Sequence, residues 1–170
     1  FAQQQLWVQA IEHYQAILTD NQDNIKIHQR LAQLYQQQGR HDEAIEEYTQ
    51  ILDLQPDDVN TYHHIAGIYR QNKQWKAAIE LYNQALENGL TQADVYSSLG
   101  ELYLRIGDKQ NAFEMYTQAV QAGETRITIY QELERMYQAQ KNKVDAELLW
   151  DTYTIANKHS PEALFQLVMH

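Results

Sequence analysis

The sequence contains no cysteine, and only two prolines and six glycines occur among its 170 residues. Without cysteine the chain cannot form disulfides, use a thiol as a nucleophile or bind zinc through thiolates. Its absence is compatible with the cytosol or the periplasm, and the cytosol is favoured unless a targeting segment precedes these residues. Because glycine and proline interrupt helices, their scarcity favours long uninterrupted helices.

Positive charge is also scarce, since 13 Lys and Arg residues stand against 23 Asp and Glu residues, a net charge of −10. No cluster of Lys and Arg departs from this acidic average, so the chain is not expected to bind nucleic acid. No run of about 18 apolar residues occurs, so no segment is expected to insert into a membrane. The sequence opens at Phe1 inside a helical pattern, and we therefore expect it to be a piece of a longer protein.

The sequence does contain a repeat of 34 residues, which is clearest in its tyrosines. One series consists of Tyr35, Tyr69, Tyr103 and Tyr137, and a second of Tyr14, Tyr48, Tyr82 and Tyr116, with Trp150 in the next place. A third series consists of Tyr62, Tyr96 and Tyr130, with His28 in the place before them. Tyr153 falls in the place of Ile17, Ile51, Ala85 and Ala119, so all twelve tyrosines fit one register. Such a period indicates a repeat architecture.

Small and apolar residues follow the same period. The small residues are Ala10, Ala44, Ala78, Ala112 and Ala146, and an apolar series consists of Leu31, Ile65, Leu99 and Leu133. Small residues let the backbones of two helices approach, while aromatic residues fill the space between successive pairs. We therefore expect Ala44, Ala78 and Ala112 to be tightly packed.

These series resemble the tetratricopeptide repeat (TPR) family. With repeats beginning at Ile25, Val59, Ala93 and Ile127, the alanines fall at position 20 of the family register and the second tyrosine series at position 24. The small residue of position 8 is Ala32, Ala66 and Gly100, and the proline typical of position 32 is kept only as Pro56. The resemblance covers essentially the whole chain and implies an all-α fold, an α-α superhelix or solenoid of antiparallel helix pairs.

The register predicts a single TPR array over residues 1–170. It consists of a partial repeat at 1–24, whole repeats at 25–58, 59–92, 93–126 and 127–160, and a partial repeat or capping helix at 161–170. The expected helix pairs are 25–38/41–53, 59–71/75–88, 93–106/109–122 and 127–140/143–157. Asp23, Asp57, Thr91 and Thr125 precede the first helices and are expected to cap them. Gly89 and Gly123 are expected to end second helices in a left-handed conformation.

The resemblance also implies where a partner binds, because the first helices of TPR proteins line a concave groove that accepts a segment of another protein. The corresponding residues are polar and rich in amides, which can hydrogen-bond a partner's backbone or side chains. They are Lys26, Gln29, Arg30, Gln33, Gln37, Asn60, His63, His64, Arg70, Asp94, Ser97, Ser98, Glu101, Arg105, Gln131 and Arg135. A solvent-exposed stripe with no partner is the alternative reading of the same residues.

Two of these residues also match a more specific binding site. Lys26 and Arg30 occupy the Lys and Arg places of carboxylate-clamp TPR domains, which hold the C-termini of chaperones. The remaining clamp residues belong to two preceding repeats, whose first helices are not among these residues. The clamp is therefore a weak alternative.

Residue patterns that carry chemistry are not found, so we expect no enzyme, no metal site and no cofactor. His63 and His64 are neighbours, and on a helix their side chains diverge by about 100° and cannot share a metal ion. Residues 20–23 faintly resemble a calcium loop but lack its turn glycine and terminal glutamate. No phosphate loop or nucleophile motif occurs.

Three functions are consistent with this sequence. The leading one is a scaffold that binds another protein or a peptide; the alternatives are a module that self-associates through its terminal repeats, and the recognition arm of an enzyme whose catalytic domain lies elsewhere. The fourth repeat is expected to pack differently, because Glu134 replaces a small residue and Trp150 and Tyr153 are larger than their counterparts. In residues 161–170, Leu164, Leu167 and Val168 share one helix face, which predicts a cap over the fourth repeat or an open face that recruits another molecule.

Overall fold

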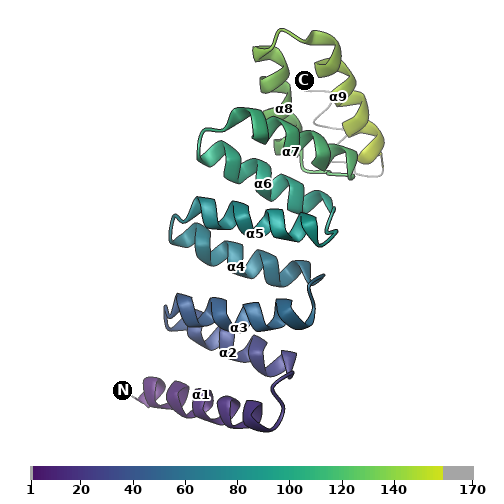
Figure 1. The fold of residues 1–170 in the computed structure, drawn as a ribbon. Helices are drawn as coiled ribbons and strands as arrows, with labels where there is room; N and C mark the ends of the chain where they lie inside the picture. The colour runs from purple at the N-terminus through teal and green to yellow at the C-terminus, as the bar shows by residue number, and fades with distance from the viewer. Residues whose placement is uncertain (1, 159–170) are drawn as a thin grey trace. The chain divides into compact units, whose positions relative to one another are not determined.

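The computed structural model describes the backbone of residues 2–158, with the side chains of residues 6–142 and 145–158. Within this range the chain forms helices and no strand (Figure 1). The helices are α1 (Ala2–Asp20), α2 (Ile25–Gln37), α3 (His41–Leu54), α4 (Val59–Gln71), α5 (Trp75–Glu87), α6 (Ala93–Arg105), α7 (Lys109–Gln121), α8 (Ile127–Ala139) and α9 (Lys143–Ala156). The expected helix pairs are confirmed, since every predicted end lies within one residue of the observed one.

The chain divides into two compact units. Unit 1 is residues 1–89 and contains α1 to α5, and unit 2 is residues 90–170 and contains α6 to α9. In unit 1, α2 packs on α3 and α4 on α5, with α3 also against α4; in unit 2, α6 packs on α7 and α8 on α9, with α7 against α8. The TPR fold class is thereby confirmed for the described helices, while the division of residues 1–170 into one array of four whole repeats stays a prediction.

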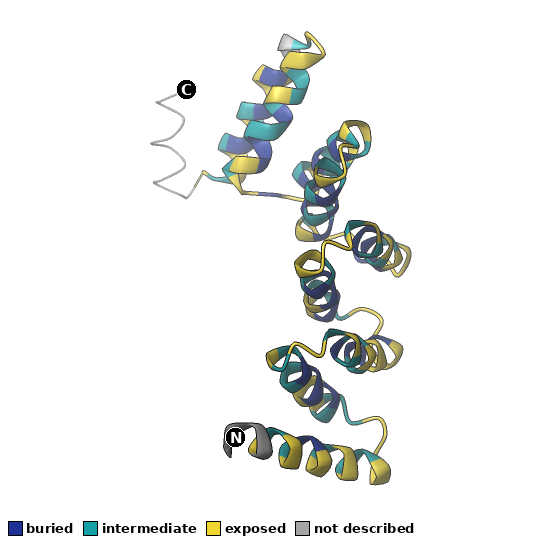
Figure 2. Cartoon of the chain, turned by 90° about the vertical axis from the view of Figure 1, so that its left-hand side faces the viewer, coloured by how far each residue is buried: buried dark blue, intermediate teal, exposed yellow. Residues whose placement is uncertain are grey.

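Each helix buries one side against its neighbours in the same unit and leaves the other side exposed (Figure 2). The repeated small residues lie on the buried side. Ala44, Ala78 and Ala112 have no exposed area, and Ala146 is 9% exposed, so the tight packing expected of this series is confirmed. A methyl group is the largest side chain that fits where paired helices approach so closely.

Gly100 marks the closest approach within unit 2. A Cβ atom placed on it would lie 2.5 Å from the Cδ1 and Cε1 atoms of the Tyr116 ring, which is too close for any real contact. Tyr116 is only 2% exposed and belongs to a cluster with Tyr130, Leu133 and Tyr153, so its ring has little room to move. Position 8 of this repeat therefore requires glycine, where the earlier repeats accept alanine.

The prediction for the helix N-termini was wrong by one residue. The residues that cap α2 and α4 are Asn24 and Asp58, whose side chains accept hydrogen bonds from the N–H groups of Ile27 and Asn60. The N-cap is the residue directly before the first helical residue. Because α2 begins at Ile25 and α4 at Val59, Asp23 and Asp57 each lie one residue before the N-cap position. Neither α6 nor α8 has a side-chain cap bond from the residue that precedes it.

Left-handed residues end the helices where the register places them. Gly89 and Gly123 have φ of +84° and +91°, which confirms their predicted role after second helices. The turn inside each helix pair uses a second left-handed position, which is glycine in two repeats but Lys73 and Lys141 in the others, with φ of +58° and +59°. The left-handed conformation has a higher free energy for a lysine than for a glycine. The geometry of the turn, and not the conformational preference of the residue, therefore sets φ at these two lysines.

The fourth repeat differs from the others as expected. Tyr153 packs edge-on against Tyr130, with ring centroids 4.9 Å apart, and against Trp150 at 5.6 Å. Glu134, in the small-residue position, is partly exposed and accepts a hydrogen bond of 3.3 Å from Gln138. The carboxylate thus avoids an unpaired buried position. The predicted cap, residues 161–170 with Leu164, Leu167 and Val168, lies outside the described residues.

The two helical glycines give a matched pair of tests for this packing. Replacing Gly100 with Ala is expected to lower the free energy of unfolding by about 1–3 kcal/mol, because the new methyl group overlaps the Tyr116 ring. Replacing Gly67 with Ala is expected to raise it by about 0.5–1 kcal/mol, because nothing lies within 4 Å of its Cβ position and alanine favours the helix. Urea melts of both variants measure the difference, and equal effects would contradict the close approach at Gly100.

Candidate functional site

The predicted binding residues lie along α2 and α4 in unit 1 and along α6 and α8 in unit 2; we call them the first-helix face. Those that are exposed are Lys26, Gln29, Arg30, Gln37, Asn60, His64, Arg70, Asp94, Arg105 and Arg135. Those that are partly exposed are Gln33, His63, Ser98, Glu101 and Gln131. Ser97 is the one residue of the face that is buried.

Tyr48 of α3 joins the first-helix face of α2 to that of α4. The ring of Tyr48 is buried, and its hydroxyl donates to Oε1 of Gln36 on α2 at 3.1 Å. The imidazole of His64 on α4 stacks on the same ring, with centroids 5.1 Å apart and planes 7° from parallel. Burial raises the pKa of Tyr48, so its hydroxyl keeps its proton and remains a donor. Gln36 and His64, from two successive repeats, therefore flank one tyrosine.

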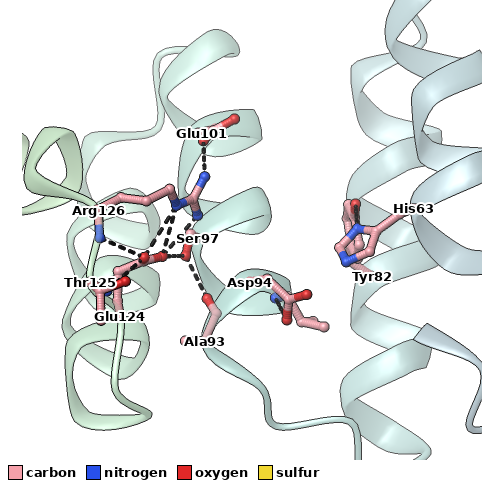
Figure 3. A network of polar contacts seen from close by, with 10 residues as sticks. His63, Tyr82, Ala93, Asp94, Ser97, Glu101, Glu124, Thr125 and Arg126 are labelled. Carbon is pink, nitrogen blue, oxygen red and sulfur yellow. Dashed lines mark hydrogen bonds and ion pairs between the residues drawn. The ribbon is translucent and has the colours of Figure 1, made fainter. Parts of the chain in front are cut away.

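The next repeat of unit 1 has a related contact. Tyr82 occupies the register position of Tyr48, and its hydroxyl lies 2.7 Å from Nδ1 of His63 (Figure 3). The two rings also meet edge to face, with centroids 5.6 Å apart. The histidine of this pair thus has a fixed orientation, and its other nitrogen is turned away from the tyrosine hydroxyl.

A buried histidine holds the start of α2 to α3. His28 is 6% exposed; its Nδ1 lies 2.7 Å from Oε2 of Glu47, and its Nε2 lies 2.8 Å from the carbonyl oxygen of Gln22. His28 therefore fills the place of Tyr62 and Tyr130 with a polar side chain that contacts both α3 and the turn before α2.

In unit 2 a hydrogen-bond network around Glu124 lies just before α8 (Figure 3). Glu124 is 5% exposed, and its Oε1 accepts hydrogen bonds of 2.9 Å from the backbone N–H groups of Thr125 and Arg126. Its Oε2 accepts from Nη2 of Arg126 at 2.8 Å, and Nη1 of the same guanidinium reaches Oε1 of Glu101 at 3.3 Å. Tyr130 donates its hydroxyl proton to the backbone carbonyl of Glu124 at 2.8 Å.

The ionisation of these groups follows from their partners. Burial by itself would raise the pKa of the Glu124 carboxyl, but the hydrogen bonds from Arg126, from Ser97 and from the backbone outweigh it and lower this pKa to about 2. Burial, with the nearby Glu124 charge, raises the pKa of Tyr130 to about 12. The network is therefore a carboxylate, a guanidinium and a neutral phenol at neutral pH.

Ser97 belongs to this network and not to an open surface. It has no exposed area, and its hydroxyl lies within hydrogen-bond distance of the Glu124 carboxylate and of the Ala93 carbonyl. The prediction that Ser97 lines the first-helix face is thus wrong. The physical reason is that a small hydroxyl fits beside a buried carboxylate that needs a donor.

Sequence reasoning missed Glu124, although a signal for it was present. Glu124 stands 68 residues after Pro56, two repeats on, and so occupies the register position of the missing proline. In place of proline's fixed backbone, its carboxylate accepts from the N–H groups at the start of α8, which has no other side-chain cap. A negative charge at a helix N-terminus also interacts favourably with the helix dipole.

Among the described residues no group of three or more His, Asp or Glu side chains could hold a metal ion. None of the described helices is long and apolar enough to cross a bilayer.

Comparison with known proteins identifies the repeat. A family model described as tetratricopeptide repeat matches residues 23–90 and, overlapping, residues 57–125, together more than half of the chain. No curated protein matches the chain.

Solved structures share the fold at low sequence identity. A crystal structure of MamA is 20% identical over 89% of this chain and 89% of its own, with a TM-score of 0.66. MamA from Desulfovibrio magneticus RS-1 is 15% identical over 91% of this chain and 88% of its own, with a TM-score of 0.62. PilF of Pseudomonas aeruginosa is 17% identical over 96% of this chain and 75% of its own, with a TM-score of 0.63. At these identities the likeness concerns the fold alone.

The Glu124 network predicts a stability that depends on pH. Replacing Glu124 with Gln is expected to lower the free energy of unfolding near neutral pH by about 1–3 kcal/mol, because the N–H groups of Thr125 and Arg126 and the hydroxyl of Ser97 lose a charged acceptor. The folded pKa of about 2 lies below the ordinary value of 4.5, so the stabilisation is complete above about pH 5 and is lost as the pH falls towards 2. Urea melts of the two proteins should therefore converge as the pH is lowered.

Glu114 of α7 is a matched control in the same unit, because its side chain is exposed. Replacing Glu114 with Gln should leave the urea midpoint within experimental error at every pH. If the difference in urea midpoint between the wild type and Glu124→Gln stays constant with pH, the charge of the Glu124 carboxylate is not the source of the stabilisation.

Proposed function

This chain belongs to the tetratricopeptide repeat family, and on that premise we propose that it is a scaffold that binds another protein through its first-helix face. The partner segment lies along the exposed residues of α2 and α4 in unit 1, and of α6 and α8 in unit 2. Members of this family bind proteins or peptides and are generally not catalysts. If the chain is instead the recognition arm of an enzyme, it binds a protein in the same way, and the catalytic domain lies outside these residues.

One observation carries this proposal. In both units the first helices bury a stripe of apolar and small residues, while the polar residues at the partner-binding positions of the family, apart from the buried Ser97, stay exposed or partly exposed. Several of them are amides, which both donate and accept hydrogen bonds and so suit the backbone of an extended segment. The aromatic side chains that would otherwise look like ligand sites, such as Tyr48 and Tyr62, are buried between helices.

Two triple variants of unit 1 test the proposal. Replacing Gln29, Gln33 and Asn60 with Ala removes amides of the first-helix face, and replacing Gln50, Glu80 and Gln84 with Ala removes exposed polar groups of the second helices. Proteins captured from the source cell by the wild type are identified by mass spectrometry, and the affinity of each purified candidate is then measured. The first-helix variant is expected to lose about tenfold in affinity for the true partner, since each lost hydrogen bond contributes about 0.5–1.5 kcal/mol. Equal binding by both variants would contradict the proposed surface.

Self-association is a second candidate function, favoured by a specific feature of α9. Leu148 and Ile155 are 60% and 71% exposed, and their spacing of seven positions, about two helical turns, places both on one side of the helix. The equivalent places in the earlier repeats hold exposed polar residues, namely Glu12, Glu46, Glu80 and Glu114 for the first and Thr19, Asp53, Glu87 and Gln121 for the second. Exposed apolar residues that replace a repeated acid support a contact surface on α9.

Restoring the repeated polar residues tests this second function. Wild-type protein is expected to show a mass above that of the 20.0 kDa monomer in light scattering as its concentration rises, and Leu148→Glu with Ile155→Glu is expected to stay a monomer with the same melting midpoint. Ile106→Glu is the control, because Ile106 is 41% exposed in the same unit but lies on another helix pair. A wild type that is monomeric at every concentration would remove this candidate.

A further inference from the structure

We propose that the partner inserts an aromatic side chain into the open space at Gly67 of α4 and stacks it on the imidazole of His64. The two residues are three positions apart and are therefore neighbours on the first-helix face of unit 1. This inference rests on the proposed function. It adds the kind of partner side chain that the face recognises, which the exposed amides alone do not specify.

Glycine at position 67 is not required by the packing of unit 1. A helix needs glycine where φ is positive or where a neighbouring group leaves no room for a Cβ atom. Gly67 lies inside α4, its φ is not positive, and no described atom lies within 4 Å of its Cβ position. Gly100 differs, because the Tyr116 ring occupies that position. Gly67 therefore makes its helix less stable than alanine would, without permitting a closer contact within the unit.

The open space at Gly67 is a gap between longer side chains. Although its Cβ direction is open, Gly67 is only partly exposed, so the groups around it rise above its backbone. On a helix these groups belong to the residues three and four positions away, which are His63, His64, Arg70 and Gln71. A side chain of a partner can therefore reach the backbone of α4 at this point, where the other positions of the face hold side chains of their own.

The register shows that this gap is particular to the second repeat. Position 9 is Gly67 here, whereas the other repeats of the register have Gln33, Glu101 and Arg135. Position 6 is His64 here, whereas the others have Arg30, Ser98 and Glu132. An aromatic ring beside a missing side chain thus occurs once in the register. The combination is not a general property of the repeat, and so it suits a specific contact.

The ring of His64 is held in place for such a contact. One face of the imidazole lies on the Tyr48 ring, with centroids 5.1 Å apart and planes 7° from parallel. Tyr48 has no exposed area, whereas His64 is exposed, so the exposed part of His64 lies away from Tyr48. A partner ring above Gly67 can extend this stack by one layer. Because the imidazole is already oriented, little freedom is lost when the partner binds.

The surroundings favour an aromatic side chain over an aliphatic one. The space is bordered by a flat ring and by bare helix backbone, and stacked aromatic pairs gain more than the burial of their area alone. An aromatic side chain also has few rotatable bonds to immobilise. Beside the stack, the Gln36 amide accepts from Tyr48 through Oε1, and its Nε2 is a donor for a backbone carbonyl of the bound segment.

NMR titration with defined peptides tests the inference. The probe is a short acetylated and amidated peptide in which Ser alternates with Gln around a central Trp, and matched peptides carry Leu or Gly at the centre. The wild type is expected to bind the Trp peptide about fivefold more tightly than the Leu peptide, because ring stacking adds to the burial of apolar area. The ring current of the bound Trp should also shift the ring protons of His64 and the Hα protons of Gly67 upfield.

Filling the gap separates binding from stability. Gly67→Ala places a methyl group in the space, and Gly67→Gln restores the residue type of Gln33 in the first repeat. Both variants should lose the preference for Trp over Leu. Their melting midpoints should equal or exceed that of the wild type, because alanine and glutamine both favour a helix more than glycine does. A loss of binding in a protein that is at least as stable cannot arise from unfolding.

Removing the ring is the second test. His64→Ala should lose the same preference for Trp over Leu. The matched control is His13→Ala on α1, because His13 is also exposed in unit 1 and also contacts a tyrosine, with ring centroids 6.2 Å from Tyr14. This control should bind all the peptides as the wild type does.

The remaining results each overturn the inference. They are equal binding of the Trp and Leu peptides, binding of neither, a preference for Trp that survives Gly67→Ala and Gly67→Gln, and ring-current shifts that fall on other residues. The proposed function is judged separately, on the captured partner. A partner that is lost with the amide variant of the first-helix face but keeps its affinity for Gly67→Gln supports the proposed function and overturns only the aromatic contact.

Discussion

The close approach of two helices at a single small side chain is the constraint on which the rest of this structure depends. Where Ala44, Ala78 and Ala112 are buried without exposed area, the second helix of a pair packs directly on the backbone of the first. In unit 2 the same approach is so tight at Gly100 that no Cβ atom fits beside the Tyr116 ring. The large aromatic residues must then fill the space between pairs, and this explains why tyrosines and small residues share one period.

This packing also decides which surface remains for a partner. Once a first helix has turned its apolar stripe and its small residue inward, the polar side chains left outside face solvent along its length. In unit 1 these side chains include amides, histidines and the three cations Lys26, Arg30 and Arg70, whereas the acids lie on α1, α3, α5 and the loops. The acids that give the protein its net charge of −10 are thus absent from α2 and α4.

The Glu124 network shows how the units solve one problem in different ways. The family places a proline before each first helix, and this chain keeps it only at Pro56. At the end of the third repeat the Glu124 carboxylate accepts hydrogen bonds from the N–H groups of the two residues before α8. The side chains of Arg126 and Ser97 also donate to this carboxylate and so compensate for its burial. At the start of α2, the buried pair of His28 and Glu47 connects the helices instead. Both devices bury polar side chains, and burial is tolerated because each of these side chains has a hydrogen-bond partner.

The sequence alone determined the helices, their pairing and the buried positions, because a period of 34 residues restricts every repeat to the same packing. The period is seen in the tyrosines and alanines, and it predicted the helix ends to within one residue. Local chemistry was less visible. The capping residues were misplaced by one, since Asp23 and Asn24 are both good caps by residue type, and only the observed hydrogen bond to the N–H of Ile27 identifies Asn24.

Only the tertiary structure decided which individual polar residues are buried and which partners they bind. Ser97 carries the register position of a surface residue, yet it is buried because a carboxylate 27 residues away needs its hydroxyl. His64 was expected to face a partner, and its stacking on Tyr48 of another helix could not be read from spacing within α4. Periodicity encodes which side of a helix is buried, whereas hydrogen bonds between helices depend on distances that arise only when the helices pack.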